Sequence, residues 1–113
     1  MRDAHLDTEA FAELEEIMED EFSTLLETYL QDAESKLSLM SEALNAGDAN
    51  SLRELSHSFK GASCNIGALP LSRLCEDVEQ LARTDQIADI SPLMPRILDE
   101  YQEVKKLLQQ KIL

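Results

Sequence analysis

The sequence predicts an all-α protein, an antiparallel four-helix bundle with a short extra N-terminal helix. Apolar residues recur three and four positions apart along most of the 113 residues, and no run of useful length alternates with a period of two. Leu, Ala, Glu and Gln are frequent, whereas β-branched residues are scarce. The connections between the apolar stripes are short, so consecutive long helices are expected to lie antiparallel as one domain over residues 1–113.

The first two helices are expected in the acidic half of the chain. Residues 1–6 are interpreted as a loose lead-in, and Asp7 or Thr8 caps a first helix. The apolar positions of this helix are Phe11, Leu14, Ile17 and Met18. After a junction at residues 19–21, a long helix is expected from about Asp20 to Ala46, with Gly47 as a left-handed C-cap. Its apolar positions are Phe22, Leu25, Leu26, Tyr29, Leu30, Ala33, Leu37, Met40 and Leu44.

A third helix is expected after Asp48, which is a favourable N-cap residue, and it should end at Gly67. Its apolar face consists of Leu52, Leu55, Phe59, Ala62 and Ile66.

Two further helices are expected in the last part of the chain. The fourth begins at residues 69–70, with Pro70 in the first turn, and ends near Thr84. Its apolar positions are Leu71, Leu74, Cys75, Val78, Leu81 and Ala82. Ser91 should cap the fifth helix, with Pro92 as its first residue. Its apolar positions are Ile97, Leu98, Tyr101, Val104, Leu108 and Ile112.

The charge of the chain argues against two classes of partner. The net charge is −13, which would repel nucleic acid and anionic membrane surfaces. Residues 1–50 hold 14 acids and 2 bases, and this half is expected to present a solvated acidic surface. No apolar run is long enough to span a bilayer, and the N-terminus lacks the apolar core of a signal peptide. Two cysteines, expected as free thiols, favour a cytoplasmic location.

His57 lies in the middle of the third predicted helix, on the face away from the core. At about 100° per residue, it falls about 180° from the centre of the apolar face. Arg53 and Gly61 lie one turn away on either side, and Lys60 and Cys64 share the same face. No acid of this helix is among these neighbours, so a local positive island is expected. A glycine within a helix costs about 1 kcal/mol relative to alanine, and Gly61 would leave the imidazole uncovered.

An exposed imidazole between two cations suits phosphoryl transfer. A free imidazole is largely neutral and nucleophilic near pH 7, and Lys60 could stabilise charge on the phosphoryl oxygens. The sequence contains neither GxxxxGK[ST] nor GxGxxG, so we expect no nucleotide site and no enzyme activity of its own. His57 would then receive its phosphoryl group from another protein, whose acidic pocket would supply any Mg²⁺. No cofactor is expected in this chain, because His57, Cys64 and Cys75 match no zinc-binding pattern. His5, in the lead-in, is given no function.

The segment from His57 to Ser63, HSFKGAS, followed by Ile66-Gly67, resembles the HxxKGxS…G signature of histidine phosphotransfer (HPt) domains. This resemblance implies a four-helix bundle in which His57 accepts the phosphoryl group, through Nε2. It further implies that Lys60 contacts that group and that Gly61 keeps the imidazole accessible. Several HPt proteins have a Gln on the next helix that binds the other ring nitrogen, and the ungapped position here is Glu79. Gln80 is an alternative partner for this ring nitrogen. That Glu79 is an ordinary solvated helix residue is an equally weighted alternative.

The resemblance also implies partners. A stand-alone HPt protein would take a phosphoryl group from the receiver domain of a hybrid sensor kinase and pass it to the receiver domain of a response regulator. Such domains dock around the histidine, and the candidate interface residues are Arg53, Ser56, Cys64 and Asn65. A monomer is expected, because the bundle core uses the apolar faces of the helices. The alternative function is a non-catalytic helical interaction module, an anti-activator or a scaffold.

Overall fold

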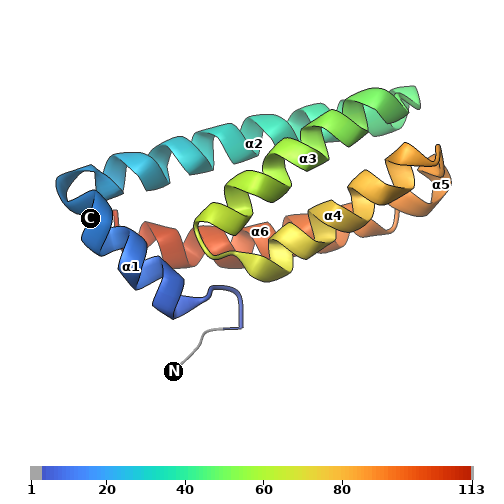
Figure 1. Ribbon diagram of the computed structural model, residues 1–113. Helices are drawn as coiled ribbons and strands as arrows, with labels where there is room; N and C mark the ends of the chain where they lie inside the picture. Colours follow the sequence, from blue (N-terminus) through green and yellow to red (C-terminus); the bar gives the residue numbers. More distant parts are fainter. Residues whose placement is uncertain (1–3, 113) are drawn as a thin grey trace.

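The computed structural model describes residues 4–112, and its helices form an up-and-down bundle in which consecutive long helices run in opposite directions (Figure 1). Within that range all regular structure is helical, so the predicted all-α class and the bundle are confirmed. The long helices are α2 (Phe22–Ala46), α3 (Ala49–Asn65), α4 (Leu69–Arg83) and α6 (Leu93–Gln109). The shorter elements are α1 (Thr8–Met18), the 3₁₀ turn η1 (Glu19–Glu21) and α5 (Ile87–Ile90).

Most of the predicted helix ends are confirmed. The Asp7 carboxylate accepts a hydrogen bond from the backbone N–H of Ala10, at 3.3 Å, and so caps α1. Asp48 caps α3 in the same way, by accepting from the backbone N–H of Ser51 at 3.1 Å. Gly47 ends α2 with a φ of +68°, a left-handed conformation that glycine adopts without steric cost.

Two predicted boundaries are wrong. Helix α2 begins at Phe22 rather than at about Asp20, because η1 turns the chain between α1 and α2. Residues before the last helix form the short helix α5, which the sequence analysis did not predict. Its last residue, Ile90, is fully buried, so this segment packs as part of the bundle instead of forming a loop. Consequently Pro92, and not Ser91, occupies the N-cap position of α6.

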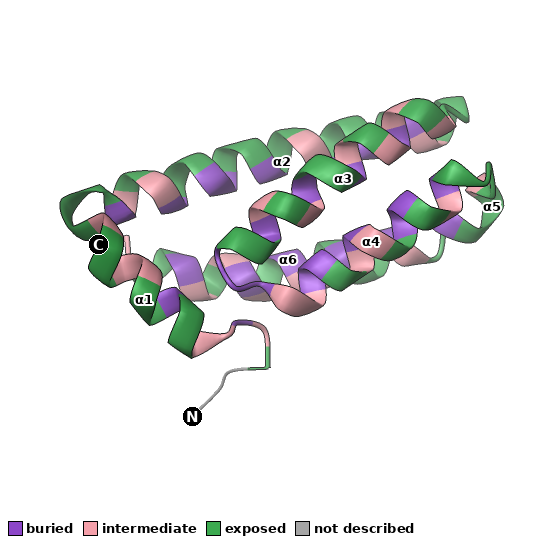
Figure 2. Ribbon diagram, in the orientation of Figure 1, coloured by how far each residue is buried: buried purple, intermediate pink, exposed green. Residues whose placement is uncertain are grey.

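The core lies along the inward faces of the long helices, where the buried positions alternate with exposed ones at helical spacing (Figure 2). Phe59 of α3 is its central aromatic residue and is fully buried. Its ring centroid lies 6.4 Å from that of Tyr29 on α2 and 6.4 Å from that of Tyr101 on α6. The aromatic contacts therefore anchor α3, the helix that carries His57, to two other helices.

Two residues assigned to apolar stripes are not in the core. The side chain of Ile17 is 76% exposed, and Leu98 is 42% exposed. In α6 the buried residue next to Leu98 is Ile97, which lies on the same face as Tyr101 and Val104. Helices α1 and α6 thus bury a face narrower than the set of apolar residues in their sequences.

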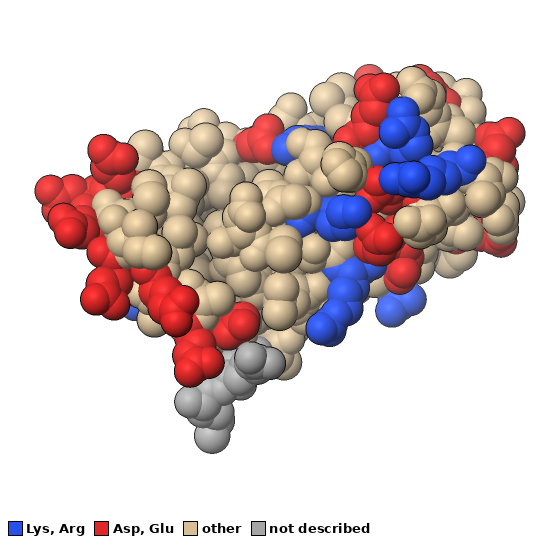
Figure 3. Space-filling view, in the orientation of Figure 1, with Lys and Arg blue, Asp and Glu red and all other residues tan. Residues whose placement is uncertain are grey.

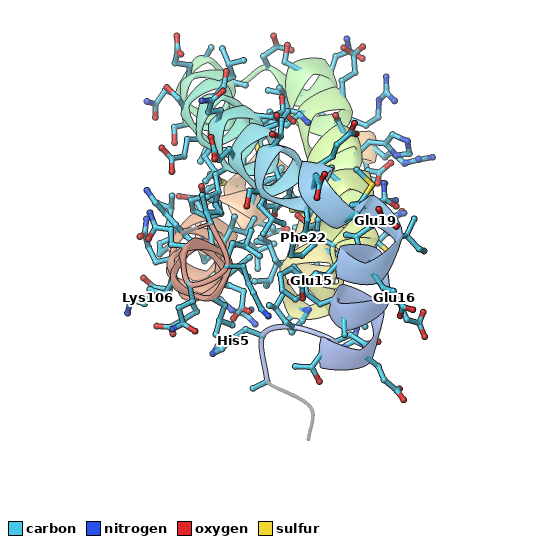
Figure 4. The ribbon with its side chains drawn as sticks, turned by 90° about the vertical axis from the view of Figure 1, so that its left-hand side faces the viewer. His5, Glu15, Glu16, Glu19, Phe22 and Lys106 are labelled. Atoms are coloured by element: carbon cyan, nitrogen blue, oxygen red, sulfur yellow. The ribbon has the colours of Figure 1, made fainter. Side chains whose placement is uncertain are left out.

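The segment before α1 is attached to the bundle, which corrects the expected loose lead-in for residues 4–6; residues 1–3 of that lead-in lie outside the described range. Leu6 is buried, and His5 Nδ1 lies 2.8 Å from Glu100 Oε2 of α6. The backbone N–H of Asp7 donates to the carbonyl of Gly67, at 2.8 Å. Figure 4 shows His5 next to α6. Among residues 4–112, no helix combines the length and the apolar character needed to cross a membrane.

Gly67 and Gly61 should respond oppositely to alanine. Gly67 has a φ of +84°, and an added Cβ would lie 3.1 Å from the carbonyl oxygen of Asp7, so Gly67→Ala should lower the free energy of unfolding by about 1–2 kcal/mol. Gly61 is helical and an added Cβ would meet nothing within 4 Å, so Gly61→Ala should raise it by about 0.5–1 kcal/mol. Urea denaturation of the two variants measures both effects. Two changes of the same sign would contradict this account.

Candidate functional site

His57 lies on the outward face of α3, and its side chain is 65% exposed. Phe59, two residues further along the helix, is fully buried on the opposite face. The helical wheel therefore placed the imidazole correctly. Gly61 lies one helical turn after His57 and has no side chain, and the space where its Cβ would lie is open. No side chain at position 61 therefore covers the imidazole.

The other side of the imidazole contacts a buried carboxylate. Nδ1 of His57 lies 2.8 Å from Oε2 of Glu79, a residue of α4 whose side chain is only 1% exposed. An ionised carboxylate can only accept a hydrogen bond, so Nδ1 carries the proton and donates a hydrogen bond to Glu79. The neutral ring is then held in the tautomer whose lone pair is on Nε2. This is the nitrogen free to act as a nucleophile.

Two cations share the Glu79 carboxylate with His57. The Lys60 ammonium lies 2.6 Å from Oε1, and Arg83 Nη2 lies 3.0 Å from Oε2. Burial of Glu79 favours its neutral form, but hydrogen bonds from Lys60, Arg83 and His57 outweigh it and lower the pKa of Glu79 to about 2. Glu79 is therefore ionised throughout the neutral range.

The expected positive island around His57 is wrong, because α4 brings acids to it. Lys60 Nζ also contacts Glu76, at 2.6 Å, and hydrogen bonds to Glu76 and Glu79 raise the pKa of the Lys60 ammonium. Two carboxylates thus offset the charges of Lys60 and Arg83. Figure 3 shows basic and acidic side chains interspersed over the α3–α4 half of this face, whereas acids alone gather around α1 and the start of α2.

Small side chains let α3 and α4 pack closely enough for these contacts. The hydroxyl of Ser72 on α4 donates to the backbone carbonyl of Lys60 on α3, at 3.0 Å. Ser63 is fully buried and its hydroxyl lies 2.8 Å from that of Tyr29. Ser56, expected at a partner interface, is also fully buried, and its hydroxyl donates to the carbonyl of Leu52 at 2.6 Å. That expectation is wrong, because Ser56 lies on the buried face of α3 with Leu52 and Phe59.

The remaining residues predicted for the partner interface, and the alternative residue Gln80, differ in their exposure and contacts. Cys64, a free thiol, and Asn65 are exposed, and Arg53 is half-buried, with its guanidinium 3.8 Å from Glu54. Gln80, the alternative to Glu79, donates to Glu76 at 3.0 Å and not to the imidazole. No group of three or more His, Cys, Asp or Glu residues within 4–112 is arranged to hold a metal ion.

Sequence reasoning missed two residues of this cluster, Glu76 and Arg83. Arg83 lies four positions after Glu79, a spacing that places the two side chains on one helix face. That spacing was visible in the sequence. The contact between Glu76 and Lys60 was not, since it crosses from one helix to the next.

The model of the Hpt domain family matches residues 24–107. This chain belongs to the Hpt domain family. It is also similar to the crystal structure of histidine-containing phosphotransfer protein B (HptB) from Pseudomonas aeruginosa PAO1, with 39% sequence identity and a TM-score of 0.94. The match covers 96% of this chain and 95% of that one. No curated protein sequence gave a significant match.

Membership of the Hpt family assigns the chain to histidine phosphotransfer in two-component phosphorelays. Hpt proteins are phosphotransfer intermediates that interact with the receiver domains of kinases and response regulators. The exposed imidazole and its buried carboxylate partner are the chemical features of this chain that such a role can use.

The buried carboxylate should make the stability of the protein depend on pH. The folded-state pKa of Glu79 is about 2, below the ordinary 4.5, so its contribution is complete above pH 4.5 and lost as the pH falls toward 2. We expect Glu79→Gln to lack this component, which amounts to as much as about 3 kcal/mol between pH 6 and pH 2. Urea unfolding of both proteins across this range measures it. A difference between them that stays constant with pH would contradict the assigned pKa.

Proposed function

We propose that this chain is a phosphorelay intermediate in which His57 carries the phosphoryl group. The donor would be the aspartyl phosphate of the receiver domain of a hybrid sensor kinase. The acceptor would be the receiver-domain aspartate of a response regulator. One observation carries the assignment of His57: its ring is exposed at Nε2 while a buried carboxylate holds the proton on Nδ1, at 2.8 Å. His5 also contacts a carboxylate through Nδ1, but its side chain is only 32% exposed and its Nε2 faces a second carboxylate, that of Glu103, at 3.9 Å.

The transfer step follows from this geometry. The Nε2 lone pair of His57 attacks the phosphorus atom, the P–O bond to the donor aspartate breaks, and its carboxylate leaves. The same step in reverse, with another aspartate, delivers the phosphoryl group. Lys60 is one helical turn from His57 and would turn its ammonium toward the phosphoryl oxygens as negative charge develops on them. Glu79 acts as a positioning residue that fixes the ring and its tautomer.

The other requirements of the reaction fall to the partner. Mg²⁺ would be bound by the receiver domain, and this chain would use neither a cofactor nor a nucleotide site of its own. In this proposal the chain is a carrier of the phosphoryl group and not an enzyme with turnover on ATP. Cytoplasmic location and a monomeric state remain predictions that fit this role.

The docking surface would surround His57 on α3. Arg53, Cys64 and Asn65 supply polar and exposed contacts, whereas Ser56 can act only through the packing of its helix. Asn65 also borders an apolar groove of about 560 Å³ between α1, α2 and α3. The residues that line this groove are Leu14, Met18, Leu25, Thr28, Tyr29, Asp32, Ala62, Asn65 and Ile66. Gly61 would allow the receiver backbone to approach the imidazole closely.

Phosphorylation of His57 is the decisive test of this function. With a phosphorylated receiver domain or hybrid kinase as donor, the wild type should acquire an acid-labile, base-stable phosphoryl group. His57→Gln should acquire none, and His5→Gln serves as the matched control that retains labelling. Radiolabel transfer followed by acid and base treatment distinguishes the cases. Labelling of His57→Gln would refute the assignment, and wild type that no cognate donor labels would favour the non-catalytic interaction module.

Lys60→Ala should slow transfer by about 100-fold, because a positioned charge that stabilises developing negative charge is lost. The fold should survive, since Arg83 and His57 still contact the Glu79 carboxylate. Lys106→Ala removes an equal charge from α6, where Lys106 is 70% exposed, and should transfer at the wild-type rate. Rapid-quench kinetics with circular dichroism of each variant measures both properties. Equal rates for the two variants would contradict the role of Lys60.

A further inference from the structure

The carboxylate of Glu79 contacts the imidazole nitrogen that does not receive the phosphoryl group. It lies 2.8 Å from Nδ1 of His57, whereas Nε2 is on the exposed side of the ring. Since the Glu79 side chain is 1% exposed, water competes little for this hydrogen bond. Because Glu79 contacts Nδ1 and the phosphoryl group would bond to Nε2, this contact is compatible with phosphorylation.

The proton on Nδ1 controls how readily a phosphoryl group on Nε2 can leave. With the proton present the phosphorylated ring is a cation, and rupture of the N–P bond returns the electron pair to Nε2 and releases a neutral imidazole. Without that proton the leaving group would be an imidazolate anion, which is a far poorer one. A group that keeps Nδ1 protonated therefore keeps the phosphoryl group reactive.

We propose, on the basis of the phosphorelay function above, that Glu79 holds phosphorylated His57 in its reactive cationic form at neutral pH. The balance of the step supports this. Neutral His57, protonated on Nδ1, attacks through Nε2; the N–P bond forms, the donor P–O bond breaks, and no proton leaves. The positive charge created on the ring then lies next to the Glu79 carboxylate, and this charge-assisted hydrogen bond stabilises it. Because the ring keeps its Nδ1 proton, the phosphorylated protein should be a stronger phosphoryl donor than one whose ring has lost that proton.

The other charges around the dyad are compatible with this role. On α3 the charged side chains within about one turn of His57 are Arg53, Glu54 and Lys60, and on α4 the nearby ones are Glu76 and Arg83. Lys60 has two carboxylate partners, so it can turn to the phosphoryl oxygens while Arg83 continues to contact Glu79. Glu79 then keeps its negative charge, and with fewer cations on it the attraction between Glu79 and the ring cation increases.

The test uses the full chain loaded with inorganic phosphoramidate, a small donor that needs no receiver domain. Loss of the phosphoryl group is followed by ³¹P NMR from pH 5 to pH 10 for wild type, Glu79→Gln and Glu76→Gln. Lability should fall with rising pH as Nδ1 loses its proton, with a midpoint about one pH unit or more higher in wild type than in Glu79→Gln. Above both midpoints the phosphoryl group should last about tenfold longer on Glu79→Gln. Glu76→Gln removes an equal charge from α4 without touching His57 and should keep the wild-type midpoint.

The outcomes separate this inference from the function on which it rests. Absence of phosphoryl label on His57 would overturn both. Label on His57 with equal midpoints in wild type and Glu79→Gln would overturn the inference alone, and a shift of the same size in Glu76→Gln would assign the effect to net charge and overturn it too. Should Glu79→Gln fail to fold, ¹⁵N NMR of phosphorylated wild type decides the matter. Its Nδ1 must stay protonated to higher pH when folded than in urea.

Discussion

The buried carboxylate of Glu79 is the constraint on which the site depends. Removing a carboxylate from water costs several kcal/mol unless cations and hydrogen-bond donors surround it. Here Lys60 and His57 from α3 and Arg83 from α4 meet that requirement. The packing of α3 against α4 and the orientation of the imidazole are thus coupled. The ring cannot rotate away without leaving a buried charge with one donor fewer.

This coupling explains how an exposed side chain can be well oriented. Surface imidazoles normally sample several rotamers, which would scatter the direction of the Nε2 lone pair. In this protein the carboxylate of Glu79, which is buried on α4, contacts Nδ1 at 2.8 Å and so fixes the orientation of the exposed edge of the ring. The opposite face of α3 is fixed in turn by Phe59, between the rings of Tyr29 and Tyr101. Helix α3 therefore contributes to both the core and the site, and its packing in the core holds His57 in position.

The fold could be predicted well because its signals are local. Helical spacing of apolar residues, the caps Asp7 and Asp48, and Gly47 each act within a few positions of the chain, and the structure confirms them. The errors occurred where burial depends on a neighbouring element. Ile17 and Leu98 are apolar but exposed, while Ser56 is polar but fully buried. Periodicity reports which face of a helix is apolar, but not how wide a strip its neighbours cover.

The candidate site divides in the same way. His57, Lys60 and Gly61 lie within one turn of one helix, so their shared outward face follows from 3.6 residues per turn. Glu79 is 22 positions away from His57, and only the register between α3 and α4 places its carboxylate against Nδ1. That register arises from side-chain volumes at the helix interface, including the serines that permit close approach, and it has no counterpart in a linear pattern. The sequence thus sufficed to propose His57 as the nucleophile, whereas helix packing sets the hydrogen-bond partner and the electrostatic surroundings of its ring.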